Sequence, residues 1–163
     1  MQHTISVLVK NEAGALSRIV GLFSARGYNI ESLTVAKTLD PEYSRATIVV
    51  SNCDAVVVEQ ILKQLHKLIP VIKVGNLTEE NSTTLELILI KVDAKESKMK
   101  ELLQIAETFG AKVINVSPKT YTLQAICDEK SFKSLIELLR PVGIKDVVRS
   151  GAVSIISTTA AAV

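Results

Sequence analysis

Apolar positions follow two different periods at the start of the chain. Over residues 4–9 apolar and polar side chains alternate, which is typical of a strand with one buried face. Over residues 16–23 apolar side chains recur at steps of three and four, which indicates one apolar stripe along a helix. Gly27 is a typical residue for the end of that helix. The chain therefore begins with a strand, a corner and a helix.

The same two periods continue to residue 77. The β-branched segment 30–38, the turn at 40–42 and the strand 43–51 predict a hairpin. A second helical stripe follows at residues 58–65, and a strand is expected over 71–77. The order is therefore β-α-β-β-α-β.

This order returns after a polar stretch, TEENSTT, at residues 78–84. The expected elements are strands at 85–92, 112–116, 121–127, 144–148 and 152–157, and helices around 99–106 and 132–139. We therefore expect two ferredoxin-like βαββαβ domains with antiparallel sheets and both helices on one face. The expected boundaries are a first domain at 1–77, a linker at 78–84 and a second domain at 85–163.

Composition and charge narrow the class of protein. The 163 residues are 47% hydrophobic and 22% charged, with a net charge of +2 and no tryptophan, which is ordinary globular usage. The charges are interleaved, so no basic stripe favours nucleic acid. No leader pattern or membrane-length apolar run is evident, and we expect a cytoplasmic protein. Cys53 and Cys127 lie far apart at the ends of apolar runs, which predicts buried or half-buried free thiols.

Catalytic chemistry is missing from the pattern. The two histidines, His3 and His66, lie at the terminus and at a helix end, and no nucleophile motif or phosphate loop accompanies them. An enzyme is therefore not expected. An RNA-binding domain of the same topology carries aromatics on its central strands, but only Tyr43 begins the third strand here. A metal chaperone of this fold is disfavoured because its first loop would carry CxxC.

The corner Asn11–Gly14 is the most informative loop. The first amides of a helix lack partners within the helix and carry partial positive charge, so a carboxylate is a natural ligand there. Gly14 permits close approach to the backbone, and Asn11 either caps the helix or binds a ligand amine. Loop chemistry alone favours the plain alternative, in which both residues only build the cap and the turn.

A second feature lies at the start of the next strand. In this fold the segment 30–36 is an edge, and an apolar β-branched edge invites pairing with another copy. A two-fold dimer would then bring Asn29 and Ile30 of one subunit to the Asn11–Gly14 corner of the other. The pocket would combine an anion site, amide side chains and an aliphatic wall, which suits an aliphatic α-amino acid.

The segment NEAGALSRIVGLFSARGYNIESL at 11–33, followed by TVAKTLDPEYSRATIVV and VEQILKQLHKLIPVIKV, closely resembles the acetolactate synthase (acetohydroxyacid synthase) small-subunit family. YTLQ at 121–124 and VRSG at 148–151 extend the resemblance to the second half. The first half resembles an ACT domain, the amino-acid-sensing form of the ferredoxin-like fold.

The resemblance implies a regulatory subunit without catalytic residues or cofactors of its own. The family's large catalytic subunit carries thiamine diphosphate, Mg²⁺ and FAD, and the small subunit activates it and confers feedback inhibition, usually by valine. The family's valine site lies between two ACT domains of a homodimer. The matching effector-binding positions here are Asn11, Ala13, Gly14, Ala15, Leu16 and Ser17 from one chain, with Asn29 and Ile30 from the other.

Other functions stay open at this point. The chief alternative is a free-standing amino-acid-binding ACT regulator of another target, and weaker ones are a nucleic-acid binder and a small hydrolase or phosphatase. The second half has no glycine corner after its first strand, which favours a structural or activating role there. The pattern does not identify the strongest branched-chain effector or the surface that contacts the large subunit.

Overall fold

The computed structural model describes residues 2–78, 82–93 and 96–157. Backbone contacts divide the chain into two compact units, one formed by residues 1–84 with 152–163 and the other by 85–151. The first unit contains β1 (Gln2–Lys10), α1 (Ala15–Ala25), β2 (Ile30–Lys37), β3 (Tyr43–Ser51), α2 (Ala55–Leu65) and β4 (Val71–Asn76). The predicted order β-α-β-β-α-β is confirmed for this unit.

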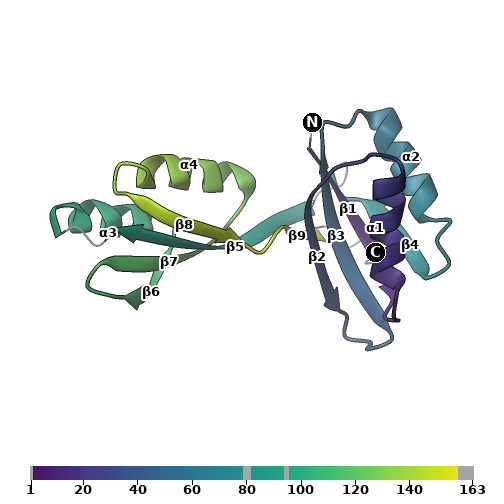
Figure 1. Cartoon of the computed structure of the whole chain (residues 1–163), viewed down its shortest axis with the longest axis horizontal. Coiled ribbons are helices and arrows are strands. Elements are labelled where there is room, and N and C mark those ends of the chain that lie inside the picture. The colour runs from purple at the N-terminus through teal and green to yellow at the C-terminus, as the bar shows by residue number, and fades with distance from the viewer. Residues whose placement is uncertain (1, 79–81, 94–95, 158–163) are drawn as a thin grey trace. The chain divides into compact units, whose positions relative to one another are not determined.

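The first unit is a sheet with its helices on one face. The strand order is β2-β3-β1-β4, and each neighbouring pair is antiparallel. Figure 1 shows α1 and α2 side by side against one face of this sheet. The alternating positions of β1 and the stripes of both helices meet in one core, which includes Ile5, Val7, Ile19, Phe23 and Ile61. This order leaves β2 and β4 as the two edges of the sheet.

The second unit repeats the arrangement. Its elements are β5 (Ser82–Asp93), a short 3₁₀ turn (Glu96–Lys98), α3 (Met99–Thr108), β6 (Lys112–Val116), β7 (Thr120–Cys127), α4 (Glu129–Leu139) and β8 (Ile144–Arg149). The sheet order is β6-β7-β5-β8, again antiparallel, with α3 and α4 on one face (Figure 1). A separate core contains Ile88, Ile90, Leu102, Leu123 and Leu135. The predicted fold class of two ferredoxin-like domains is therefore confirmed.

The structure differs from the expected boundaries at both ends of the second half. Residues 79–81 of the expected linker lie outside the described residues, but Ser82–Thr84 already belong to β5 rather than to a linker. The closing strand, β9 (Val153–Ile156), pairs with β5 and groups with the first unit. Hydroxyl pairs explain this pairing, because Thr84 Oγ1 lies 2.7 Å from Ser154 Oγ. A polar stretch rich in threonine thus forms a strand although it lacks apolar residues.

Two general expectations can be checked on the described residues. Both cysteines are free thiols, Cys53 half-buried and Cys127 buried. Burial raises the pKa of the Cys127 thiol, and the negative charge of Glu86 raises it further. Among the described helices none has the length and apolar character needed to cross a membrane.

A buried carboxylate holds one end of the second sheet in place. The Glu86 side chain is only 6% exposed, and Arg149 binds both of its oxygens, with Nε donating to Oε2 at 3.0 Å. The same guanidinium pairs with Glu129 and lies 4.1 Å from the centre of the Phe132 ring. These contacts join β5, β8 and α4. Hydrogen bonding to Glu86 raises the pKa of Arg149, so the arginine stays charged.

Replacing Arg149 by leucine should destabilise the second unit because it leaves a buried carboxylate without its partner. The free energy of unfolding should fall by about 2 kcal/mol, less than the loss of a fully buried pair costs, because the arginine side chain is 37% exposed. Urea unfolding measures this change. The double variant Glu86→Leu/Arg149→Leu should recover most of the loss, since no unpaired charge remains.

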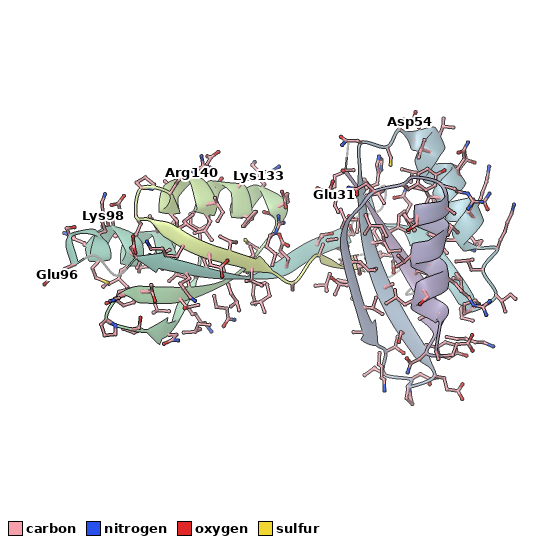
Figure 2. The ribbon with its side chains drawn as sticks, in the orientation of Figure 1. Glu31, Asp54, Glu96, Lys98, Lys133 and Arg140 are labelled. Carbon is pink, nitrogen blue, oxygen red and sulfur yellow. The ribbon has the colours of Figure 1, made fainter. Side chains whose placement is uncertain are left out.

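The matched control is Lys133→Ala, on the exposed face of α4 (Figure 2). This change removes only the ion pair between Lys133 and Glu129. The Lys133 side chain is 69% exposed and the Glu129 side chain is 37% exposed. Exposed pairs contribute little, so the change should be below about 0.5 kcal/mol. Equal losses for Lys133→Ala and Arg149→Leu would contradict the special role of the Glu86 pair.

Candidate functional site

The corner between β1 and α1 is a tight turn built on Gly14. This glycine is the N-terminal cap of α1 and has a φ of +84°, in the left-handed region that favours glycine. The Ala15 amide donates to the Glu12 carbonyl at 3.2 Å and closes the turn. A side chain at position 14 would project into open space, with no described atom within 4 Å of its Cβ. The backbone here is therefore open to a ligand.

The start of α1 carries no cap from a side chain. Its first turn contains no acidic residue, and Gly14 has no side chain to offer. By contrast, Asp54 caps α2 by accepting from the Val57 amide at 2.8 Å, and Asp128 caps α4. Within the described residues, no acceptor is found for the Leu16 and Ser17 amides. These two amides, at the positive end of a helix, suit an anionic group.

The side chain of Asn11 does not cap α1 in the structure. Its Nδ2 donates to the Pro41 carbonyl at 3.0 Å, and its Oδ1 accepts from Ser44 Oγ at 3.2 Å. The backbone amide of Asn11 also donates to the Glu42 carbonyl at 2.7 Å. Asn11 therefore fastens the corner to the loop between β2 and β3, and of the two alternatives for its side chain, capping of α1 is excluded by the structure. Capping fails because Gly14, three residues later, occupies the cap position.

The remaining corner residues divide by exposure. Ala13, Gly14, Leu16 and Ser17 are exposed, whereas Ala15 is 4% exposed and packs in the core of the first unit. The Ala15 amide is already bonded to Glu12, so it is not free for a ligand. Of the corner amides, those of Leu16 and Ser17 remain without an acceptor within the described residues.

Asn29 and Ile30 do not meet the corner within one chain. Ile30 pairs with Val50 at one end of β3, whereas Lys10 pairs with Tyr43 at the other end. The two ends are about 23 Å apart at the usual strand rise of about 3.3 Å per residue. Figure 2 agrees, because Glu31 and Asp54 lie at the end of the first unit away from the loop that joins β2 and β3. A site that combines both sets of residues therefore requires a second chain.

The start of β2 is itself well defined. The Asn29 side chain is exposed, and its Nδ2 donates to Glu31 Oε1 at 3.2 Å. Ile30 is half-buried and packs against the core, so only part of its side chain is available to a ligand. The middle of β2 carries no charged side chain from Ser32 to Ala36, and β2 is an edge of the sheet. Such an edge is suited to pairing with another strand.

Sequence reasoning did not find the partners of Asn11. Pro41 and Glu42 contribute carbonyl groups, which leave no trace in a residue pattern. Ser44 is buried at the start of β3, and the pattern shows it only as one more alternating polar position. These groups lie beside Asn11 because the β1–β3 register pairs Lys10 with Tyr43, and this register is known only from the structure.

The comparisons with known proteins agree along the whole chain. Residues 5–73 match the family described as AHAS small subunit-like ACT domain, and residues 85–158 match the small subunit of acetolactate synthase. The chain is 46% identical over 156 residues to an acetolactate synthase small subunit of Haemophilus influenzae, covering 95% of each. It is 46% identical over 154 residues to that of Aquifex aeolicus, covering 94% of this chain and 80% of the relative.

A solved structure supports the same assignment. The crystal structure of the acetolactate synthase small subunit from Thermotoga maritima matches with a TM-score of 0.87 and 33% identity, covering 98% of this chain and 99% of that one. The fold and the first-half match define an ACT-type protein with ferredoxin-like βαββαβ domains. At this identity and coverage, the chain belongs to the acetolactate synthase small-subunit family.

Replacing Asn11 by alanine should destabilise the first unit, because the side chain loses its bonds to Pro41 and Ser44. The free energy of unfolding should fall by about 1–2 kcal/mol in urea unfolding. The matched control is Glu12→Ala at the neighbouring exposed position, for which we expect a change below about 0.5 kcal/mol. Equal stability of the Asn11 variant and the parent would show that the corner is not held by this side chain.

Proposed function

We propose that this chain is the regulatory subunit of an acetolactate synthase, that it activates the catalytic large subunit, and that valine bound at the β1–α1 corner inhibits the assembly. The observation that carries the proposal is the uncapped start of α1, with free amides at Leu16 and Ser17, in a chain of the small-subunit family. In this proposal the chain has no catalytic residues. Thiamine diphosphate, Mg²⁺ and FAD belong to the large subunit, in branched-chain amino-acid synthesis.

The corner matches the chemistry of an aliphatic α-amino acid. The amides of Leu16 and Ser17 are the proposed donors to the carboxylate, and Gly14 leaves the approach open. Asn29 is the proposed polar contact for the ammonium group, because its side-chain oxygen is an acceptor. The exposed Leu16 and the accessible part of Ile30 would form the aliphatic wall.

A two-fold pairing of β2 with itself completes this site. Antiparallel pairing about the middle of β2 would place Ile30 of the partner subunit near Lys37, at the end of the sheet where the corner lies. Asn29 of the partner subunit would then lie at the same end. The uncharged middle of β2 supports such pairing.

Inhibition at this place would work by linkage. A ligand inhibits only if it binds the less active arrangement more tightly than the active one. A valine held between two chains senses their relative position, so it would favour one arrangement of the dimer. The large subunit would respond to that arrangement, and by reciprocity its binding would alter the affinity for valine.

The direct experiment reconstitutes the full chain with its large subunit and titrates acetolactate formation with valine, leucine and isoleucine. We expect the small subunit to raise the activity, and valine to lower it again in a saturable manner. The large subunit alone is the control and should be insensitive to valine. No activation and no amino-acid sensitivity in the reconstituted assembly would overturn the proposal.

Gly14→Asp should abolish valine inhibition, because it places a carboxylate beside the amides that would hold the ligand's carboxylate. The matched control is Gly14→Ala, which keeps the same strained φ and adds only a methyl group in open space. We expect the alanine variant to keep most of its affinity, and the aspartate variant to bind valine at least about tenfold more weakly by calorimetry. Equal losses would indicate backbone strain rather than charge.

Mixed dimers test whether the site is shared between chains. One chain carries Gly14→Asp and the other Asn29→His, and either change alone should disable both sites of a homodimer. In the mixed dimer both changes fall in one site, so the other site is intact. The mixed dimer should therefore bind about half as much valine per dimer as the parent. Purification with two different tags and calorimetry give the measurement. A mixed dimer that binds no valine would contradict a site shared between the two chains in this way.

A further inference from the structure

A buried serine lies on the core face of β3, where the other side chains are apolar. Ser44 is 7% exposed and lies on the same face of β3 as Ala46 and Ile48, which belong to the core of the first unit. Its neighbours across the sheet are Val9 on β1 and Lys37 on β2. Burying a hydroxyl costs free energy unless the hydroxyl is hydrogen-bonded. Packing alone therefore does not explain a serine at this position.

The partner of this hydroxyl among the described residues is the Asn11 side chain. Ser44 Oγ lies 3.2 Å from Asn11 Oδ1, and Asn11 Nδ2 lies 3.0 Å from the Pro41 carbonyl oxygen. A carbonyl group can only accept, so the nitrogen of the Asn11 amide faces Pro41 and its oxygen faces Ser44. That oxygen is also only an acceptor, so Ser44 is the donor. The orientation of the Asn11 side-chain amide is thus fixed from both sides.

The fixed amide keeps hydrogen-bonding capacity that the chain does not use. A side-chain amide has two N–H donors and two lone pairs on its oxygen, and the chain takes one of each from Asn11. Asn11 is exposed, in contrast to Ser44, so the second donor and the second lone pair are open to a ligand. They match the polar end of an α-amino acid, in which the carboxylate accepts hydrogen bonds and the ammonium group donates them.

The main chain already ties this corner to both neighbouring loops. The Lys10 amide donates to the Pro70 carbonyl at 2.8 Å, and the backbone amide of Asn11 donates to the Glu42 carbonyl at 2.7 Å. What the side-chain bonds add is the orientation of the Asn11 amide. A side chain that is ordered before binding loses less conformational freedom when a ligand binds to it.

We propose that Ser44 is a positioning residue of the valine site. Its hydroxyl holds the Asn11 amide so that the unused donor and lone pair of Asn11 are presented to the polar end of an aliphatic α-amino acid. Ser44 itself does not touch the ligand, because its one printed contact is with the Asn11 oxygen and its side chain is buried. The inference rests on the proposed function and extends the corner to a residue behind it.

The test titrates valine into the full chain by calorimetry. Ser44→Ala should raise the Kd about threefold to tenfold, which corresponds to ordering one side chain on binding. Ser44→Thr retains the hydroxyl and should bind within about twofold of the parent chain. The matched control is Ser6→Ala, which removes a hydroxyl that is 2% exposed on the opposite face of the same sheet. Its Kd should also stay within about twofold of the parent value.

A double-mutant cycle tests whether Ser44 acts through Asn11. In an Asn11→Ala background, Ser44→Ala should change the Kd by less than about twofold, because no amide remains for the hydroxyl to hold. Nitrogen-15 relaxation of the Asn11 side-chain amide gives an independent readout. Its order parameter should fall in Ser44→Ala and recover in Ser44→Thr, whereas a purely structural serine would leave it unchanged.

The outcomes separate this inference from the proposed function. If the parent chain binds valine and Ser44→Ala binds it equally well, the positioning role is overturned alone. Equal losses for Ser44→Ala and Ser6→Ala would also overturn it, because the effect would then be a general one on the sheet. So would a loss of the same size in the Asn11→Ala background. If the parent chain binds no valine, the proposed function fails and the positioning role fails with it.

Discussion

The arrangement of the first unit depends on how the end of β1 is held. The Lys10 amide is bonded to the loop before β4, and Asn11 is bonded to the loop between β2 and β3 through its backbone and its side chain. These bonds fix the direction in which the chain leaves the sheet. They also fix the start of α1, where Gly14 turns the chain and leaves the Leu16 and Ser17 amides free. The uncapped start of α1 and the positions of the two bonded loops thus depend on one anchored corner.

The second unit repeats the anchor but enters its first helix without a glycine turn. The Asp93 amide donates to the Gly143 carbonyl at 2.9 Å, as the Lys10 amide does to Pro70, so the last residue of the first strand is held in the same way in both units. The Asp93 carboxylate, however, pairs with Lys145 at 3.2 Å. A short 3₁₀ turn, Glu96–Lys98, then leads into α3. The repeat therefore preserves the bond that the fold requires, whereas the glycine at the start of the first helix has no counterpart at Lys98, the N-cap of α3.

Periodicity alone predicts the element order, the fold class and most of the core, because burial of one strand face and one helix stripe determines where apolar residues stand. It fails at Ser82–Thr84, where hydroxyl pairs and backbone bonds replace apolar burial, whereas β9 confirms the strand expected at 152–157. It also fails for Asn11, because the pattern contains the side chain and not the carbonyl groups it binds. Residues whose partners are main-chain atoms of distant loops become visible only in three dimensions.

The anchored corner also limits how a signal could leave the proposed site. Asn11 already has a donor and an acceptor on the chain, so a ligand that takes either one exchanges a bond of the fold for a bond of its own. Such an exchange changes the net free energy little, since one hydrogen bond replaces another of similar strength. The backbone amide of Asn11 still donates to the Glu42 carbonyl, so such an exchange would weaken the link between β1 and the β2–β3 loop without breaking it. Linkage would require that a ligand at the proposed site bind two arrangements of that loop with different affinities.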